Sequence, residues 1–202
     1  MKKITAIALI FALICMLSAC GKQQAAPSPS PTAKADISQL KADPVGITIT
    51  LEDGRSIKAN LYPKLAPITV ENFTKLCNMN FYDGLIFHRV INGFMIQGGG
   101  MDKNGMQKQT DTIKGEFKQN GVDNPLSHKR GVLSMARTAL SMDSASSQFF
   151  IVQADSTHLD GQYAAFGEVT EGMDVVDEIA AVQTDSNDAP TEPIVIKSIT
   201  VD

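Results

Sequence analysis

Residues 87–99 have the sequence FHRVINGFMIQGG, which places Arg89 and Gln97 among large apolar side chains. A guanidinium held beside apolar side chains is costly to desolvate unless it interacts with another group. The stretch therefore predicts a site on strands whose ligand is apolar and also bears a carbonyl group.

Three later blocks belong with residues 87–99 in the comparison that follows: GVLSMA at 131–136, SQFFI at 147–151 and LDGQYAAFGEV at 159–169. A prolyl peptide fits such a site, because its ring favours an apolar pocket while its carbonyl and nitrogen accept hydrogen bonds. In their order along the chain, the four blocks resemble the cyclophilin family of peptidyl-prolyl cis/trans isomerases, or rotamases. The resemblance covers most of the region 45–202.

The pattern of apolar residues predicts a mostly β domain. Alternation over 45–51 and 57–61, joined by Asp53-Gly54, is typical of a hairpin. Helices are expected from Pro67 to about Asn80 and over 173–181, and short strands over 85–91, 94–97, 132–136, 148–152, 164–169 and 194–201. These elements favour an antiparallel barrel or sandwich. The resemblance narrows this to a closed eight-stranded antiparallel barrel capped by a helix at each end.

The resemblance also implies roles for particular residues. Arg89 matches the family arginine that acts on the prolyl nitrogen, and Gln97 matches an amide that binds a substrate carbonyl or positions the arginine. Other matched positions form the proline pocket or hold the peptide: Phe94, Met95, Ala136, Arg137, Gln148, Phe150, His158, Leu159 and Tyr163. By pattern alone, each apolar residue among them would be assigned to the ordinary core, and only the match of whole blocks around Arg89 and Gln97 favours the site. No cofactor or metal is implied.

Four positions depart from well-known members of the family. Asn92 replaces a usual proline, and Arg137 replaces a small amide residue, which suggests recruitment of acidic peptides. His158 lies where drug-sensitive members have tryptophan, and Tyr163 replaces a histidine. Because an imidazole offers less apolar area than an indole, the resemblance predicts weak cyclosporin binding. His88 alternates away from Arg89 and is expected to be a structural, hydrogen-bonded histidine.

The beginning of the chain indicates export. Lys2 and Lys3 precede an apolar run over 4–17, as in a signal peptide, and the run is too short to span a bilayer. The sequence LSACG at 17–21 resembles a bacterial lipobox, which implies a signal peptide over 1–19 and diacylglyceryl attachment, with palmitate, at Cys20. A plain secretory signal with an incidental cysteine is the alternative. With two or more acyl chains, the mature protein would be extracytoplasmic and anchored in a cell membrane.

A flexible tether rich in Pro, Ser and Ala is expected over 20–43, followed by one isomerase domain over 44–202. A proline-rich ligand for another protein is the alternative for the tether. Loss of Lys2 and Lys3 with the signal leaves sixteen basic and twenty-two acidic residues, so nucleic-acid binding is not expected. Cys77 is expected to be a buried hydrophobe.

Other chemistries have little support in the sequence. The run Gly98-Gly99-Gly100 lacks the spacing of a phosphate-binding loop, and the three histidines lack metal-ligand spacing. We therefore expect an isomerase that acts on proline-containing peptides and assists the folding of exported, unfolded proteins. A non-catalytic peptide-binding or holdase module that uses the same groove is the principal alternative.

Overall fold

The computed structural model describes residues 36–202. The expected signal peptide, Cys20 and the expected tether as far as residue 35 lie outside the described residues. Within 36–202, no helix is both long and apolar enough to cross a membrane.

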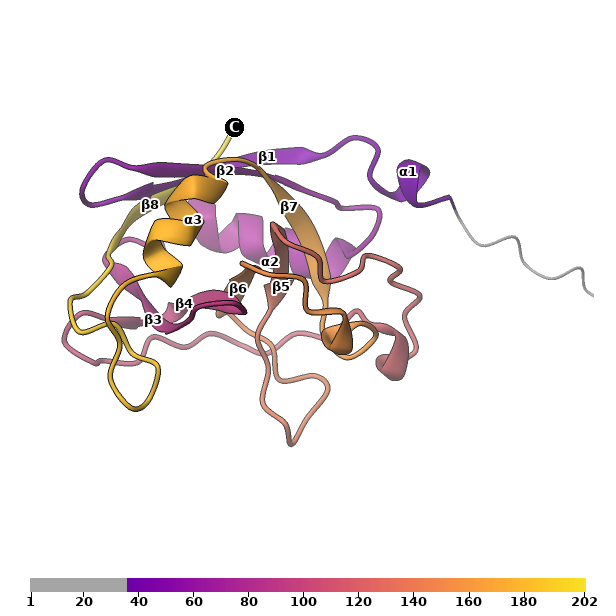
Figure 1. Cartoon of the computed structure of the whole chain (residues 1–202). Helices are drawn as coiled ribbons and strands as arrows, with labels where there is room; N and C mark the ends of the chain where they lie inside the picture. The colour runs from indigo at the N-terminus through magenta and orange to yellow at the C-terminus, as the bar shows by residue number, and fades with distance from the viewer. Residues whose placement is uncertain (1–35) are drawn as a thin grey trace, which may run out of the picture. The chain divides into compact units, whose positions relative to one another are not determined.

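Eight strands form one antiparallel sheet in the order β3-β4-β6-β5-β7-β2-β1-β8. The strands are β1 Val45–Leu51, β2 Ser56–Leu61, β3 Leu85–Ile91, β4 Met95–Asp102, β5 Val132–Met135, β6 Phe149–Val152, β7 Ala165–Glu171 and β8 Ile196–Val201. The two end strands meet: Ile86 and Val195 form an isolated bridge, and the backbone N–H of Phe87 donates to the Ile194 carbonyl at 3.0 Å. The sheet is therefore a nearly closed barrel, which confirms the predicted fold class (Figure 1).

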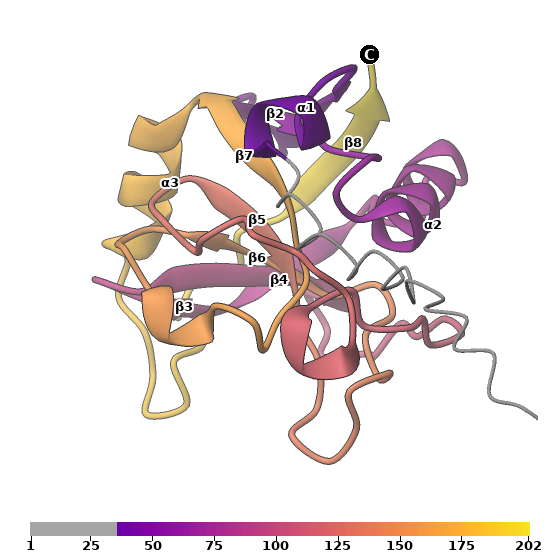
Figure 2. The same ribbon diagram turned by 90° about the vertical axis from the view of Figure 1, so that its right-hand side faces the viewer.

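The two expected helices are present as α2 Pro67–Asn78 and α3 Met173–Ala180, and they lie on opposite sides of the strands (Figure 2). Pro67 occupies the first turn of α2, where its missing N–H costs nothing. Phe73 and Cys77 project from α2 into the core, and burial raises the pKa of the Cys77 thiol to about 12. Two single-turn 3-10 helices, Lys118–Asn120 and Thr157–Leu159, lie in the connections.

Aromatic side chains dominate the barrel core. Phe149 packs edge-on against Phe73 and Tyr82 at ring-centroid distances of 5.3 and 5.7 Å. Such pairs add to the stabilisation that burial of apolar area provides. A second buried cluster, centred on Met95, Phe150 and Leu159, forms the base of the site described below.

β4 continues past the strand expected over 94–97 and runs through three glycines to Asp102. Two of these glycines have no room for a side chain. Gly99 has a φ of +85°, and a Cβ there would lie 2.9 Å from the Ser147 carbonyl oxygen; a Cβ on Gly100 would collide with the Gln148 side chain. Gly99 and Gly100 therefore allow β4 to pack closely against the 147–148 segment.

A short helix not expected from the sequence, α1 Ile37–Leu40, precedes β1 (Figure 1). Asp36 caps it by accepting a hydrogen bond from the Ser38 N–H at 3.0 Å. The Lys41 ammonium lies 2.7 Å from Glu168 on β7, and Glu168 also accepts a hydrogen bond from the Tyr62 hydroxyl at 2.7 Å. Residues 36–43, which the sequence assigned to the tether, thus contact the barrel.

Candidate active site

A cavity of about 120 Å³ opens where β3, β4 and β6 face the loops that follow β5 and β6. Nine of the predicted site residues line it: Arg89, Phe94, Met95, Gln97, Ala136, Arg137, Phe150, Leu159 and Tyr163. The remaining two lie beside it. Gln148 lines an adjoining cavity of about 130 Å³, and the His158 ring lies 5.7 Å from that of Phe94. The structure therefore brings all eleven residues to one face of the barrel.

The base of the cavity is apolar and buried. Met95, Phe150 and Leu159 are buried, and antiparallel pairing of β4 with β6 sets Gln97 opposite Phe150. The Tyr163 ring meets the Phe150 ring edge-on at 5.9 Å, which fixes one wall. An apolar ring of a ligand would bind here favourably, because its burial removes apolar surface from water.

Arg89 lies at the rim of the cavity and is half-exposed. Its Nε donates to an Asp188 carboxylate oxygen at 3.3 Å, while its terminal guanidinium nitrogens have no hydrogen bond within residues 36–202. Asp188 follows α3 in a loop and has a φ of +64°, and its carbonyl accepts from the Val90 N–H at 2.8 Å. The ion pair therefore leaves the outer end of the guanidinium available to a ligand.

A bulge in β3 determines where Arg89 points. Leu85 and Phe87 are buried, but the next buried residue is Val90, and the pairing with β4 shifts between Phe87 and Arg89. An extra residue in one strand changes which side chains face the core. Without this shift, the Arg89 side chain would face the core, as that of Phe87 does. The bulge places the cation at the cavity instead.

His88 lies at this bulge and was expected to be a hydrogen-bonded structural residue. Burial lowers the pKa of its imidazole. Its Nδ1 is buried and has no hydrogen-bond partner among residues 36–202. His88 lines neither cavity, and the hydrogen bond expected for its imidazole is not made by Nδ1 within residues 36–202.

Two amides lie beside the arginine. The Gln97 Nε2 donates to the Gln148 Oε1 at 2.9 Å, so each side chain orients the other. Gln97 pairs with Arg89 across β3 and β4 and lines both cavities. This arrangement can present an amide to a peptide carbonyl next to the apolar cavity.

Arg137, in the loop after β5, also lines the cavity. Its Nε donates to the Gln162 carbonyl at 2.9 Å and its Nη1 to the Thr138 carbonyl at 3.0 Å. The guanidinium lies over the rings of Tyr163 and Phe117, 4.8 and 5.3 Å from their centroids. The same side chain therefore forms part of both cavities.

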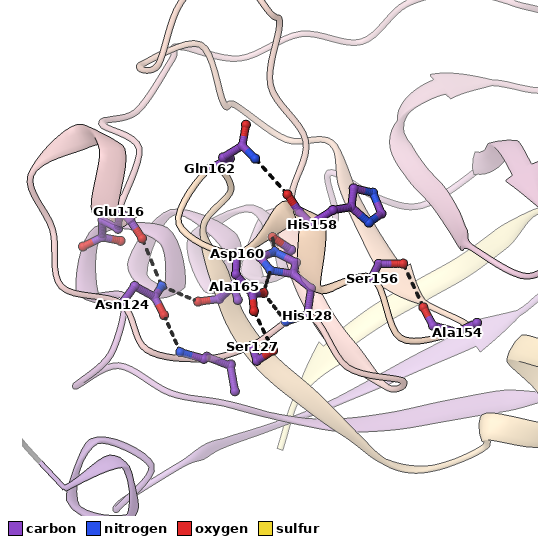
Figure 3. A network of polar contacts seen from close by, with 12 residues as sticks. Glu116, Asn124, Ser127, His128, Ala154, Ser156, His158, Asp160, Gln162 and Ala165 are labelled. Carbon is purple, nitrogen blue, oxygen red and sulfur yellow. Dashed lines mark hydrogen bonds and ion pairs between the residues drawn. The ribbon is translucent and has the colours of Figure 1, made fainter.

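A partly buried polar network around His128 and Asp160, which the sequence did not reveal, lies behind Phe150 and Leu159 (Figure 3). Asp160 accepts from the Ser127 hydroxyl and the His128 N–H, both at 2.7 Å, and lies 2.9 Å from His128 Nδ1. His128 Nε2 lies 2.9 Å from the Ser134 hydroxyl, and the imidazole stacks on the Phe150 ring. The network thus ties the turn that carries Leu159 to the strand beneath Phe150.

Aspartate, histidine and serine in series are also the components of a hydrolase triad. Here His128 and Ser134 are both fully buried and line neither cavity. Burial lowers the pKa of His128. No local sequence motif joins residues 128, 134 and 160, so only the tertiary structure shows the network, and its role is structural.

A larger open hollow, of about 620 Å³, lies elsewhere on the molecule, between the β1–β2 turn and the loop after α3. Its cation, Arg55, is already bound to Asp53 and Glu178 at 2.6 and 2.7 Å. Within residues 36–202, no group of three His, Cys, Asp or Glu side chains is arranged to hold a metal ion. The apolar cavity beside Arg89 is therefore the better candidate site.

An apolar cavity on an antiparallel barrel, with a guanidinium and paired amides at its rim, is suited to binding a peptide that carries an apolar ring. Residues 46–201 match the family model described as "Cyclophilin type peptidyl-prolyl cis-trans isomerase/CLD". The chain belongs to this family, and its activity is peptidyl-prolyl cis/trans isomerisation.

Curated relatives and solved structures agree with this assignment. Peptidyl-prolyl cis-trans isomerase A of Dickeya dadantii is 47% identical over 153 residues, covering 71% of this chain and 77% of that protein. Isomerase B of Escherichia coli is 46% identical over 149 residues, covering 67% of this chain and 87% of that protein. The crystal structure of a cyclophilin type isomerase from Cryptosporidium parvum has a TM-score of 0.67 and 28% identity, covering 79% of this chain and 98% of that chain.

Proposed function

We propose that Arg89 is the catalytic residue and that the cavity of about 120 Å³ receives the proline ring. The single observation that carries this proposal is the position of the half-exposed guanidinium at the rim of an apolar cavity, with its terminal nitrogens unbonded within residues 36–202. A peptide that enters the cavity brings its prolyl nitrogen to this rim.

The reaction is rotation about an amide bond, whose barrier of about 20 kcal/mol comes from resonance. In the twisted transition state the prolyl nitrogen regains its lone pair, which can accept a hydrogen bond. Donation from Arg89 then stabilises the transition state more than either planar isomer, which is the requirement for catalysis. An acceleration of about 10⁵ requires about 7 kcal/mol of such differential stabilisation.

Neighbouring groups supply binding and orientation. Phe94, Met95, Phe150 and Leu159 surround the ring, and the Gln97 amide, oriented by Gln148, binds a peptide carbonyl. A second structure of the Cryptosporidium parvum relative was determined in the presence of the dipeptide Ala-Pro, which supports a prolyl ligand for this fold. A donor held in place by Asp188 beside an apolar cavity needs little reorganisation during the reaction.

The test is an exchange assay on short X-Pro peptides, by NMR line shape or coupled proteolysis. We expect Arg89→Ala to lower kcat/KM at least about 100-fold, as for loss of one preorganised donor. Arg55→Ala is a matched control, because Arg55 is also partly exposed and ion-paired but lies away from the cavity. Retained peptide binding by Arg89→Ala would separate catalysis from docking, whereas full activity of this variant would exclude the proposed role.

We also propose that the chain is a lipoprotein of the cell membrane that assists the folding of exported proteins. The support is the charged start, the apolar run over 4–17 and the LSACG motif around Cys20. Two acyl chains or more would hold the domain at a membrane surface, where exported chains emerge unfolded.

Mass spectrometry of the mature amino terminus tests the anchor. We expect a chain that begins with a diacylated Cys20, and we expect Cys20→Ala to move the protein from the membrane fraction to the soluble one. An unmodified amino terminus, or membrane retention of the Cys20→Ala protein, would contradict the anchor without affecting the isomerase activity.

A further inference from the structure

Among residues 36–202, Arg137 is a cation without an acidic partner. It forms no ion pair within residues 36–202, where its guanidinium hydrogen-bonds only to the backbone carbonyls of Thr138 and Gln162. Arg89, the other arginine at the site, is already paired with Asp188. A partly buried charge that meets only neutral acceptors retains capacity for a carboxylate.

The side chain is held in place before any ligand arrives. Two backbone carbonyls hold its Nε and Nη1, and its guanidinium carbon lies over the rings of Tyr163 and Phe117. Restraint of a rotamer-rich side chain in the free protein lowers the entropy cost of binding. The Arg137 side chain is therefore preorganised for binding an anion.

The surroundings of Arg137 are suited to an anionic side chain. The cavity of about 130 Å³ that adjoins the proline cavity is lined by Gln97, Ala136, Arg137, Thr138, Ser144, Ser146 and Gln148. Of residues 36–202, no Asp or Glu belongs to this lining, and several of its members carry hydroxyl or amide donors. A carboxylate in this cavity would meet one positive charge and no negative charge.

The two cavities share Gln97, Ala136 and Arg137, so they lie side by side. In an extended peptide, side chains two residues apart point to the same face, about 6.5–7 Å from each other. A peptide with its proline in the first cavity therefore directs the side chain two positions away toward the second.

We propose that the Arg137 cavity is a carboxylate subsite and that the enzyme prefers client segments with Asp or Glu two residues from the proline. This inference rests on the isomerase activity and is independent of the membrane anchor. Arg137 acts as a specificity-determining residue through contact with the client side chain.

The test compares kcat/KM for X-Pro peptides that differ only by Glu or Gln, placed two residues before or two residues after the proline, in low salt at pH 7. We expect the Glu peptide of at least one pair to react about fivefold faster, as for a partly exposed ion pair. Arg137→Gln should bring that ratio to about 1, and Arg137→Lys should keep part of it. Arg130→Gln is the matched control, because Arg130 is bound to Asp177 and lines neither cavity.

Two measurements on the unaltered protein keep the test independent of how the variants fold. The Glu preference should decrease as salt screens the charges and as pH falls through the carboxyl pKa of the peptide, near 4.3. Equal rates for Glu and Gln peptides in both placements would overturn the inference, as would a preference that survives in Arg137→Gln. Inactivity toward every peptide would instead contradict the isomerase function itself.

Discussion

The Nε of Arg89 on β3 lies 3.3 Å from the carboxylate of Asp188, a residue almost one hundred positions later in the chain. The Asp188 carbonyl also accepts the Val90 N–H at 2.8 Å, so one loop residue fixes both the strand and its arginine. Since the pair uses the inner nitrogen of the guanidinium, it orients the cation without occupying its outer end.

We expect Asp188→Asn to lower kcat about threefold to fivefold with little change in KM, because the arginine loses its orienting charge but not the cavity. Asparagine tolerates the positive φ of this position, so the backbone is preserved. Steady-state kinetics on one X-Pro peptide measure the effect. An increase in KM alone would show that Asp188 contributes to binding rather than to the orientation of Arg89.

The domain should lose stability as the pH falls below about 6.5, the usual pKa of a histidine side chain. Burial lowers the pKa of both His88 and His128, so the unfolded chain binds protons that the native state does not. The free energy of unfolding therefore decreases as pH falls below about 6.5, by at most about 1.4 kcal/mol per pH unit for each histidine. Urea unfolding between pH 7.5 and pH 5 measures the slope, and His128→Gln should make it shallower. A stability that rises over this range would contradict the assignment.

A second loss of stability is expected at lower pH. The Arg130 Nη2 lies 2.6 Å from the Asp177 Oδ2, and this guanidinium lowers the pKa of Asp177 to about 2. A carboxylate with a depressed pKa contributes stability above its unfolded value of about 3.9 and loses it as pH falls toward 2. Because this pair is exposed, the contribution is about 1 kcal/mol or less. Asp177→Asn should remove that part of the acid transition, and an unchanged transition would show that the pair contributes nothing.

Gly100 makes room for Gln148, so Gly100→Ala should disturb the Gln97–Gln148 pair. We expect a loss of about 1–3 kcal/mol of stability, as for overpacking, together with reduced kcat/KM. The double variant with Gln148→Ala should recover the stability but not the activity, because the colliding side chain and the orienting amide are the same group. Thermal unfolding and peptide exchange measure the two effects separately, and full activity of the double variant would show that Gln148 is dispensable.

His158 faces the Phe94 ring at the rim of the cavity, and cyclosporin binding is expected to be weak. An imidazole provides less apolar contact than an indole. His158→Trp should therefore tighten inhibition about tenfold in an exchange assay with cyclosporin. Nanomolar inhibition of the unaltered protein would contradict this expectation.

The local pattern of the sequence was sufficient for most of the fold. Alternation on both sides of Asp53-Gly54 predicted the hairpin of β1 and β2, and Pro67 marked the start of α2. These features depend on interactions between near neighbours, which residue order alone specifies. The sequence did not show why Gly99 and Gly100 are needed in β4. They leave room for Ser147 and Gln148, which lie on a segment some fifty residues away.

For the site, the sequence by itself determined which residue types were available, and the family resemblance indicated which of them belong together. Only the tertiary structure decided how they act as a group: the bulge that turns Arg89 out of the core, the loop that brings Asp188 to it, and the His128–Asp160 network beneath Phe150. The physical reason is distance along the chain. Each of these arrangements depends on register and packing between remote segments, and the free energy that fixes them is realised only when the barrel closes.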